Sequence, residues 1–180
     1  VIRYLIKKTA YYAIRWYYRF LAVPDSLLPY LNTWDPSFKK PKSPSDYAKN
    51  AEQLFFKKNS YPVDTLIPKE IHFTGKIYLL TNATNSSSSF FMADILQQNK
   101  AAELIGESTG GTKQGINGGQ FFFLSLPASG IEVDIPLVFQ APVNPRPDEG
   151  IQPDIKVKTK QRDLAGNDDA QLQYLAKHFK

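Results

Sequence analysis

The chain contains no cysteine and very little histidine. Among its 180 residues there is no Cys, and the two His are at positions 72 and 178. The lack of cysteine excludes disulfides, cysteine-based metal sites and catalysis by a thiol. Two histidines so far apart in the sequence argue against a zinc site. We therefore expect neither a metal nor another cofactor.

The chain also lacks a long uninterrupted apolar run and a strong excess of charge. Its formal net charge is +5, and the basic residues are dispersed in short groups at 7–8, 39–42 and 57–58. Dispersed groups are typical of solvated surfaces, so we expect no nucleic-acid partner. Charges interrupt residues 1–22 too often for a membrane span, and no signal-peptide cleavage site follows them. This composition indicates a globular domain without an integral membrane segment.

Residues 1–70 are expected to form a helix followed by a proline-rich insert. Aromatic and basic residues at 1–22 predict a helix of about six turns that ends before Pro24. Its aromatic side would pack on a sheet or on another subunit, although the same mixture also suits a helix at a membrane surface. Prolines recur throughout 23–70, and only residues 45–58 predict a further helix.

The most informative segment is TNATNSSSS at 81–89, a loop of small hydroxyl and amide residues. The apolar residues at 75–80 predict a strand of a parallel sheet, buried on both faces. Residues 90–98 predict a short amphipathic helix. This order places serine hydroxyls at the end of a strand and backbone N–H groups at a helix start, where an oxyanion is stabilised. Serines that only cap the helix would give the same pattern.

Further motifs follow this loop in order. They are a strand pattern with IGESTGG ending at 111, NGG at 117–119, strand-like segments at 120–127 and 130–136, and DEGIQPD at 148–154. The ordered set covers about residues 71 to 160 and resembles the tail-specific protease family. That family comprises the C-terminal processing peptidases and their tricorn-core and retinol-binding-protein relatives. The resemblance implies an α/β fold with a ClpP/crotonase-like core, a mixed and partly parallel sheet with flanking helices.

The resemblance also implies a serine-type endopeptidase that acts on polypeptides through an acyl-enzyme. Aligning IGE and the glycines that follow it places the family's nucleophile on Ser87, with the backbone N–H of Ser88 as half of the oxyanion hole. The other half belongs, in the family, to an upstream glycine-rich segment that residues 1–70 do not contain. We therefore expect the chain to be the C-terminal part of a longer catalytic domain, with its serine-bearing part at 71–180.

The resemblance leaves the general base undecided. In the C-terminal processing branch a lysine accepts the proton, and its position falls here on Thr112. Lys113, one residue beyond, is a candidate base, and the alternative is a solvated loop lysine. A lysine acts as a base only when burial or neighbouring cations lower its pKa.

In the tricorn-like branch the base is a histidine, supported by a carboxylate near the PD motif. Asp148 and Glu149 are candidates for that carboxylate, and the alternative is a turn built around Gly150. His72 and His178 match neither branch.

Two functions follow from the resemblance. One is a serine peptidase acting on polypeptide substrates, and the other is a relative that keeps the fold and binds a peptide or a lipophile without hydrolysis. The family also suggests a bacterial extracytoplasmic location, in the periplasm or cell envelope. The expected partners are a polypeptide substrate, the missing N-terminal part of the same protein, or further copies of it.

Overall fold

The computed structural model describes residues 1–60, 63–166 and 168–178, which form two compact units. We call the first the serine unit; it comprises Val1–Tyr12, Thr65–Lys113 and Pro147–Lys180. The second, the hairpin unit, comprises Ala13–Asp64 and Gln114–Arg146. Each unit is assembled from segments distant in sequence. The expected boundary near residue 70 stays a prediction about the full-length protein.

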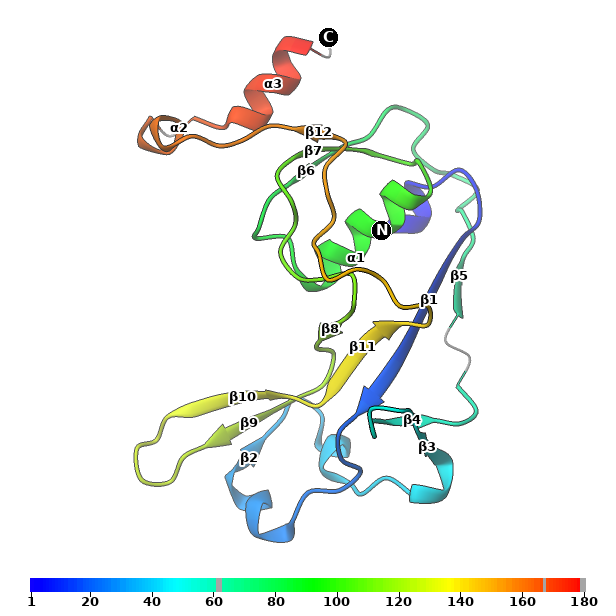
Figure 1. Cartoon of the computed structure of the whole chain (residues 1–180), viewed down its shortest axis with the longest axis vertical. Coiled ribbons are helices and arrows are strands. Elements are labelled where there is room, and N and C mark those ends of the chain that lie inside the picture. The colour runs from blue at the N-terminus through cyan, green and yellow to red at the C-terminus, as the bar shows by residue number, and fades with distance from the viewer. Residues whose placement is uncertain (61–62, 167, 179–180) are drawn as a thin grey trace. The chain divides into compact units, whose positions relative to one another are not determined.

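The serine unit contains a parallel sheet and the helix that connects two of its strands (Figure 1). The strands β6 (Tyr78–Thr81), β7 (Glu103–Gly106) and β12 (Ile155–Lys156) lie in the order β12-β7-β6, and each neighbouring pair is parallel. Helix α1 (Ser87–Gln98) joins β6 to β7, as a parallel connection requires. The predicted α/β fold with a partly parallel sheet is confirmed.

Helix α1 is held by one buried side. Phe90, Ala93, Ile95 and Leu96 are each at most 5% exposed, and Leu96 is fully buried. Ile95 and Leu96 pack with Ile6 and Ala10 in a common cluster. The spacing of these apolar residues follows the helical period, which is why this segment forms an amphipathic helix after a strand. The serine unit also contains η1 (Ile2–Tyr4), α2 (Gln161–Ala165) and α3 (Ala170–His178).

The hairpin unit is formed mainly by short strands. They are β1 (Ala10–Tyr18), β2 (Leu31–Asn32), β3 (Tyr47–Lys49), β4 (Phe55–Lys57), β5 (Val63–Leu66), β8 (Ile116–Asn117), β9 (Phe121–Ser125), β10 (Glu132–Pro136) and β11 (Val138–Pro142), with short 3-10 turns η2 (Asp25–Tyr30), η3 (Pro36–Lys39) and η4 (Pro44–Asp46). The boundary between the units falls within β1 and β5. One sheet has the order β3-β4-β1-β11-β8, with β5 also paired to β1, and a second has the order β10-β9-β2.

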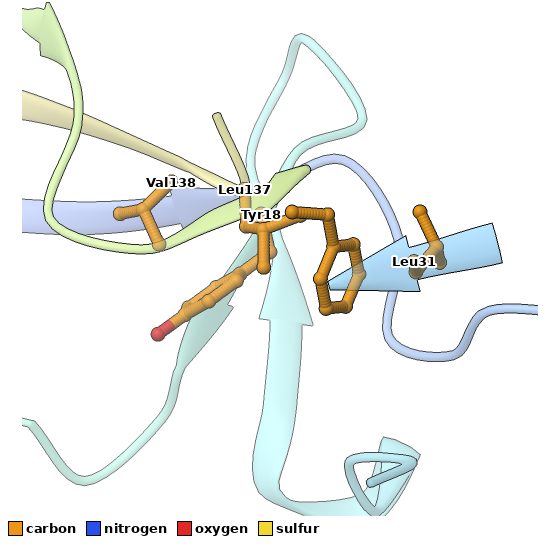
Figure 2. Packing of buried hydrophobic residues seen from close by; sticks show 5 residues of the cluster. Tyr18, Leu31, Leu137 and Val138 are labelled. Atoms are coloured by element: carbon orange, nitrogen blue, oxygen red, sulfur yellow. The ribbon is translucent and has the colours of Figure 1, made fainter. Parts of the chain in front are cut away.

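The core of the hairpin unit lies around Tyr18, Leu31, Leu137 and Val138, whose side chains Figure 2 shows together. Phe122 completes the cluster at 1% exposed. Leu137 lies between β10 and β11, and Val138 is the first residue of β11. These two core residues therefore lie where the chain passes from one sheet to the other. Burial of the aromatic and branched residues of β1, β2, β9 and β11 therefore holds the two sheets of this unit together.

Two predicted helices are wrong. Residues 1–22, expected as one long helix, form the 3-10 turn η1 and strand β1, which pairs with β11 from Ile14 to Tyr18. Residues 45–58 form the hairpin of β3 and β4. Tyr, Trp, Ile and Phe favour strands when a partner strand is present. For β1 that partner lies far along the chain, and no local pattern indicates it.

No helix in the described ranges is long and apolar enough to span a membrane.

The buried side of α1 predicts a stability difference between two leucines in helices. Leu96→Ala should lower the free energy of unfolding by about 2–5 kcal/mol, because it leaves a cavity in the core. Leu172→Ala in α3 is the matched control: this leucine is 54% exposed, and its loss should cost less than about 1 kcal/mol. Urea denaturation followed by circular dichroism measures both. Equal losses would contradict the packing described for α1.

Candidate functional site

The candidate site lies in the serine unit, where three loops meet around β6, β7 and α1. They are the serine loop at 82–86, between β6 and α1, the glycine loop at 107–113, after β7, and the acidic loop at 147–154, before β12. The carboxyl ends of the parallel strands β6 and β7 share one edge of the sheet. The sequence-predicted residues Ser87, Lys113 and Glu149 thus belong to a single compact unit.

The serine loop is fixed by its asparagines. Asn82 N–H donates to Asn85 Oδ1 at 2.7 Å, and Asn85 N–H donates back to the Asn82 carbonyl at 3.0 Å. The Asn82 side chain accepts from the Thr84 N–H at 2.9 Å and from the Thr84 hydroxyl at 2.6 Å. Side-chain bonds of this kind replace a backbone turn. The loop therefore has a defined path before it reaches the serines.

Ser87 is the first residue of α1 and has a left-handed backbone, with φ of 52°. Two other described non-glycine residues share this property, Gln53 between β3 and β4 and Lys100 just after α1. Hairpin turns and helix C-termini accept such a conformation routinely, whereas a helix start does not. Strain of this kind at a strand-to-helix turn is typical of residues that present a functional side chain.

The Ser87 side chain is exposed, and its hydroxyl has no hydrogen-bond partner among the described residues. Ser86, the N-cap residue, forms no capping bond through its side chain. The Ser89 hydroxyl donates to the Ser86 carbonyl at 2.8 Å. The N–H groups of Ser89 and Phe90 donate to the Ser86 carbonyl, at 3.2 and 3.4 Å, whereas those of Ser87 and Ser88 have no acceptor among the described residues. The arrangement thus offers an exposed hydroxyl next to unsatisfied backbone donors, which is what an oxyanion site requires.

The glycine loop packs directly against the serine loop. Glu107 N–H donates to the Thr81 carbonyl at 2.8 Å, and the Thr81 hydroxyl donates to the Glu107 carbonyl at 2.9 Å. A Cβ added at Gly110 would collide with the backbone carbonyl of Ala83, so only glycine fits this approach. Gly111 has φ of 81° and lies next to the Phe90 ring. The glycines of this motif therefore set the distance between the two loops.

The acidic loop is bound to the glycine loop by reciprocal hydrogen bonds. Thr109 N–H donates to the Ile151 carbonyl at 3.1 Å, and Ile151 N–H donates to the buried Thr109 hydroxyl at 2.8 Å. A side chain at Gly150 would collide with the Thr109 carbonyl. The glycine at this position is thus explained by close packing.

Lys113 and Glu149 form an ion pair across these loops. Lys113 Nζ lies 2.9 Å from Glu149 Oε1, and Lys113 N–H donates to the Glu149 carbonyl at 2.9 Å. The Lys113 side chain is therefore engaged with the acidic loop and not with the serine loop. Asp148 is exposed. The catalytic roles of Lys113, Asp148 and Glu149 stay predictions.

The two histidines are engaged locally. His72 Nδ1 lies 2.9 Å from the Lys69 carbonyl, and His178 Nδ1 lies 2.9 Å from the Tyr174 carbonyl. His178 also stacks on the Tyr174 ring at 4.1 Å. In the described part of the chain, no group of three or more His, Asp or Glu side chains could hold a metal ion.

One supporting residue was missed by the sequence interpretation. Gln171 of α3 is 6% exposed, and its side-chain amide donates to the Thr81 carbonyl at 3.0 Å. Thr81 ends β6 directly before the serine loop, so this bond ties α3 to the base of the candidate site. A single glutamine in a polar helix gives no signal in the sequence that would identify it.

A cavity of about 520 Å³ in the same unit does not include the serine loop. Its lining comes from residues that precede β6, such as Lys76 and Ile77, and from residues around the end of α1, such as Lys100 and Ala101. These positions lie at the amino ends of β6 and β7. Of the three loops, only the acidic loop reaches this cavity, through Asp154 at its end, and Ser87 does not line it.

Comparison with known proteins gives one family and a consistent fold. A family model described as peptidase family S41 matches residues 26–157, more than half of the chain. No curated protein matches the chain in sequence.

Solved structures match nearly the whole chain. A candidate peptidase from Parabacteroides merdae ATCC 43184 matches with a TM-score of 0.56 at 16% identity, over 98% of this chain and 44% of that one. Mature CPAF in complex with lactacystin matches with a TM-score of 0.56 at 15% identity, over 98% of this chain and 39% of that one. At such low sequence identities, these matches show a similar fold and nothing more. The chain spans less than half the length of these two proteins.

The close approach of the two loops predicts the effect of a methyl group at Gly110. Gly110→Ala should destabilise the protein by about 1–3 kcal/mol, because the added Cβ displaces the Ala83 carbonyl and the serine loop with it. Gly118→Ala is the matched control, since a Cβ there would meet nothing closer than the Gln140 side chain at 3.9 Å. Denaturation curves measure both variants. A tolerated Gly110→Ala would contradict the loop packing.

Proposed function

The chain belongs to peptidase family S41, and we propose that it supplies the nucleophilic serine of a serine-type peptidase, with Ser87 as that residue. The observation that carries the proposal is the exposed Ser87 hydroxyl on a left-handed residue, at the turn between a parallel strand and a helix. The glycine loop behind this turn holds the serine loop in place. A fixed, exposed hydroxyl beside free N–H groups suits attack on a carbonyl.

In the proposed reaction, Ser87 Oγ attacks the carbonyl carbon of a peptide bond, and its proton passes to a general base. The Ser88 N–H donates to the oxyanion of the tetrahedral intermediate. Collapse of that intermediate expels the amine, which takes up a proton, and leaves an acyl-enzyme. Water then releases the carboxylic acid and restores the hydroxyl. The C-terminal processing subtype and an extracytoplasmic location belong to the proposal as well, because both rest on the family resemblance.

The fluorophosphonate reaction tests the nucleophile directly. A fluorophosphonate probe should label the full-length protein that contains this chain, and Ser87→Ala should abolish labelling and lower peptide hydrolysis by at least about 10³-fold. Ser88→Ala is the matched control, since it keeps the backbone N–H and should keep the labelling. If the folded full-length protein is not labelled, the peptidase proposal fails. Binding of a peptide or a lipophile without hydrolysis is then the better function.

Variants of the Lys113–Glu149 pair test whether the general base is Lys113 or a group elsewhere in the full-length protein. Because the Lys113 side chain is engaged with Glu149 at 2.9 Å, we expect the base to come from outside this pair and Lys113→Gln to keep fluorophosphonate labelling. For a pair whose side chains are 17% and 46% exposed, Lys113→Gln and Glu149→Gln should each cost at most about 1 kcal/mol of stability. Loss of labelling in Lys113→Gln alone, with the fold intact, would identify Lys113 as the base.

A further inference from the structure

The sheet β10-β9-β2 of the hairpin unit has apolar side chains on both faces. Its strand β9 contains three consecutive phenylalanines, Phe121, Phe122 and Phe123. Successive residues of a strand point to opposite faces. Phe122 belongs to the buried core, so Phe121 and Phe123 lie on the face opposite that core. An outward face would ordinarily be polar, and aromatic residues there indicate a contact surface.

Trp34 extends this outer face beyond β2. Its ring packs on Phe121, with centroids 5.5 Å apart, and on Phe123 at 5.4 Å. Trp34 is nevertheless 62% exposed. Three rings thus form an aromatic patch that is only partly covered by the described chain. Trp is among the residues that contribute most to binding energy when a partner covers them.

Strand β10 places two carboxylates on the same face. Asp134 pairs with Phe123, and Glu132 pairs with Ser125. Cross-strand partners share one face of a sheet, so both carboxylates lie beside the aromatic patch. Both residues are exposed, and neither has an ion pair with another described residue. The patch therefore has an acidic border on one side.

The backbone of the same two residues faces the open edge of the sheet. β10 is the outer strand of the order β10-β9-β2, as Figure 1 shows for the hairpin of β9 and β10. Leu126 N–H donates to the Ile131 carbonyl at 2.9 Å, and Leu137 N–H donates to the Gln120 carbonyl at 2.9 Å. Hydrogen-bonded and non-hydrogen-bonded pairs alternate in an antiparallel ladder. The N–H and C=O groups of Glu132 and Asp134 therefore point away from β9.

We propose that this edge and face bind an extended polypeptide carrying alternate basic residues, which adds to β10 as a further strand. Its backbone pairs with Glu132 and Asp134, and its residues opposite them project onto the face of the aromatic patch. A lysine or arginine there meets a carboxylate directly, and its apolar stem covers the rings beside Trp34. A strand with acidic residues at the same positions is repelled, because like charges directly opposite destabilise a strand pair.

The test uses the full-length protein with Ser87→Ala, so that no peptide is cleaved and the outcome does not depend on peptidase activity. The probe is a short fluorescein-labelled peptide alternating arginine and valine, followed by fluorescence polarisation. We expect saturable binding of this peptide and none of a matched peptide with glutamate in place of arginine. Methylating every backbone nitrogen of the peptide removes its N–H donors, including those of the arginines opposite Glu132 and Asp134, and should also abolish binding.

Variants assign the binding to this surface. Glu132→Gln with Asp134→Asn should weaken binding about 2- to 30-fold, and Trp34→Ala should weaken it about tenfold or more. The matched control is Glu52→Gln with Asp25→Asn, which removes the same charge elsewhere on this unit and should leave the affinity unchanged. Circular dichroism confirms that each variant is folded.

Three results would overturn the proposal. The first is equal binding of the arginine and glutamate peptides, and the second is equal weakening by the control pair and the Glu132 and Asp134 pair. The third is a dimer in sedimentation velocity that Trp34→Ala dissociates, because the occupant of the patch is then a second copy of the protein.

Discussion

The candidate site depends on how closely the glycine loop approaches the serine loop. At Gly110 the two backbones lie so near that no side chain fits between them. Two hydrogen bonds between Thr81 and Glu107 hold the same contact where the strands end. Because β6 and β7 are parallel, their loops leave the same end of the sheet, and a glycine is needed where the two backbones come closest, at Gly110. Because Ala83 belongs to the serine loop, this contact constrains the path of that loop and the position of Ser87, where α1 begins.

The left-handed backbone of Ser87 requires compensation, since such strain costs about 1–3 kcal/mol at a residue other than glycine. The hydrogen bonds of Asn82 and Asn85, before Ser87 in the chain, and the burial of α1, after it, supply this compensating stability. The bond from Gln171 to the Thr81 carbonyl adds a third support, from a helix near the end of the chain. These contacts surround the serine while leaving its hydroxyl exposed.

The sequence predicts the elements at 75–98 and the strands β9 and β10 well, and residues 1–60 poorly, for a physical reason. Strand, serine loop and helix at 75–98 are local features, and their apolar periods and turn residues are read directly from the chain. The glycine motif at 106–111 is also local, because only glycine suits its backbone angles and close contacts. The residues of β1, in contrast, form a strand because β11, β4 and β5 pair with them. Its basic and aromatic residues fit a helical period equally well, and nothing nearby distinguishes the two.

The position of Lys113 in the sequence and its contacts in the structure indicate different roles for this residue. The sequence places a lysine close to where one branch of the family has its base, and the structure gives that lysine a carboxylate partner at 2.9 Å. The same pair also links the glycine loop to the acidic loop, together with the bonds between Thr109 and Ile151. The contact was not evident from the sequence, because Lys113 and Glu149 lie 36 residues apart along the chain and are brought together only by the packing of the two loops.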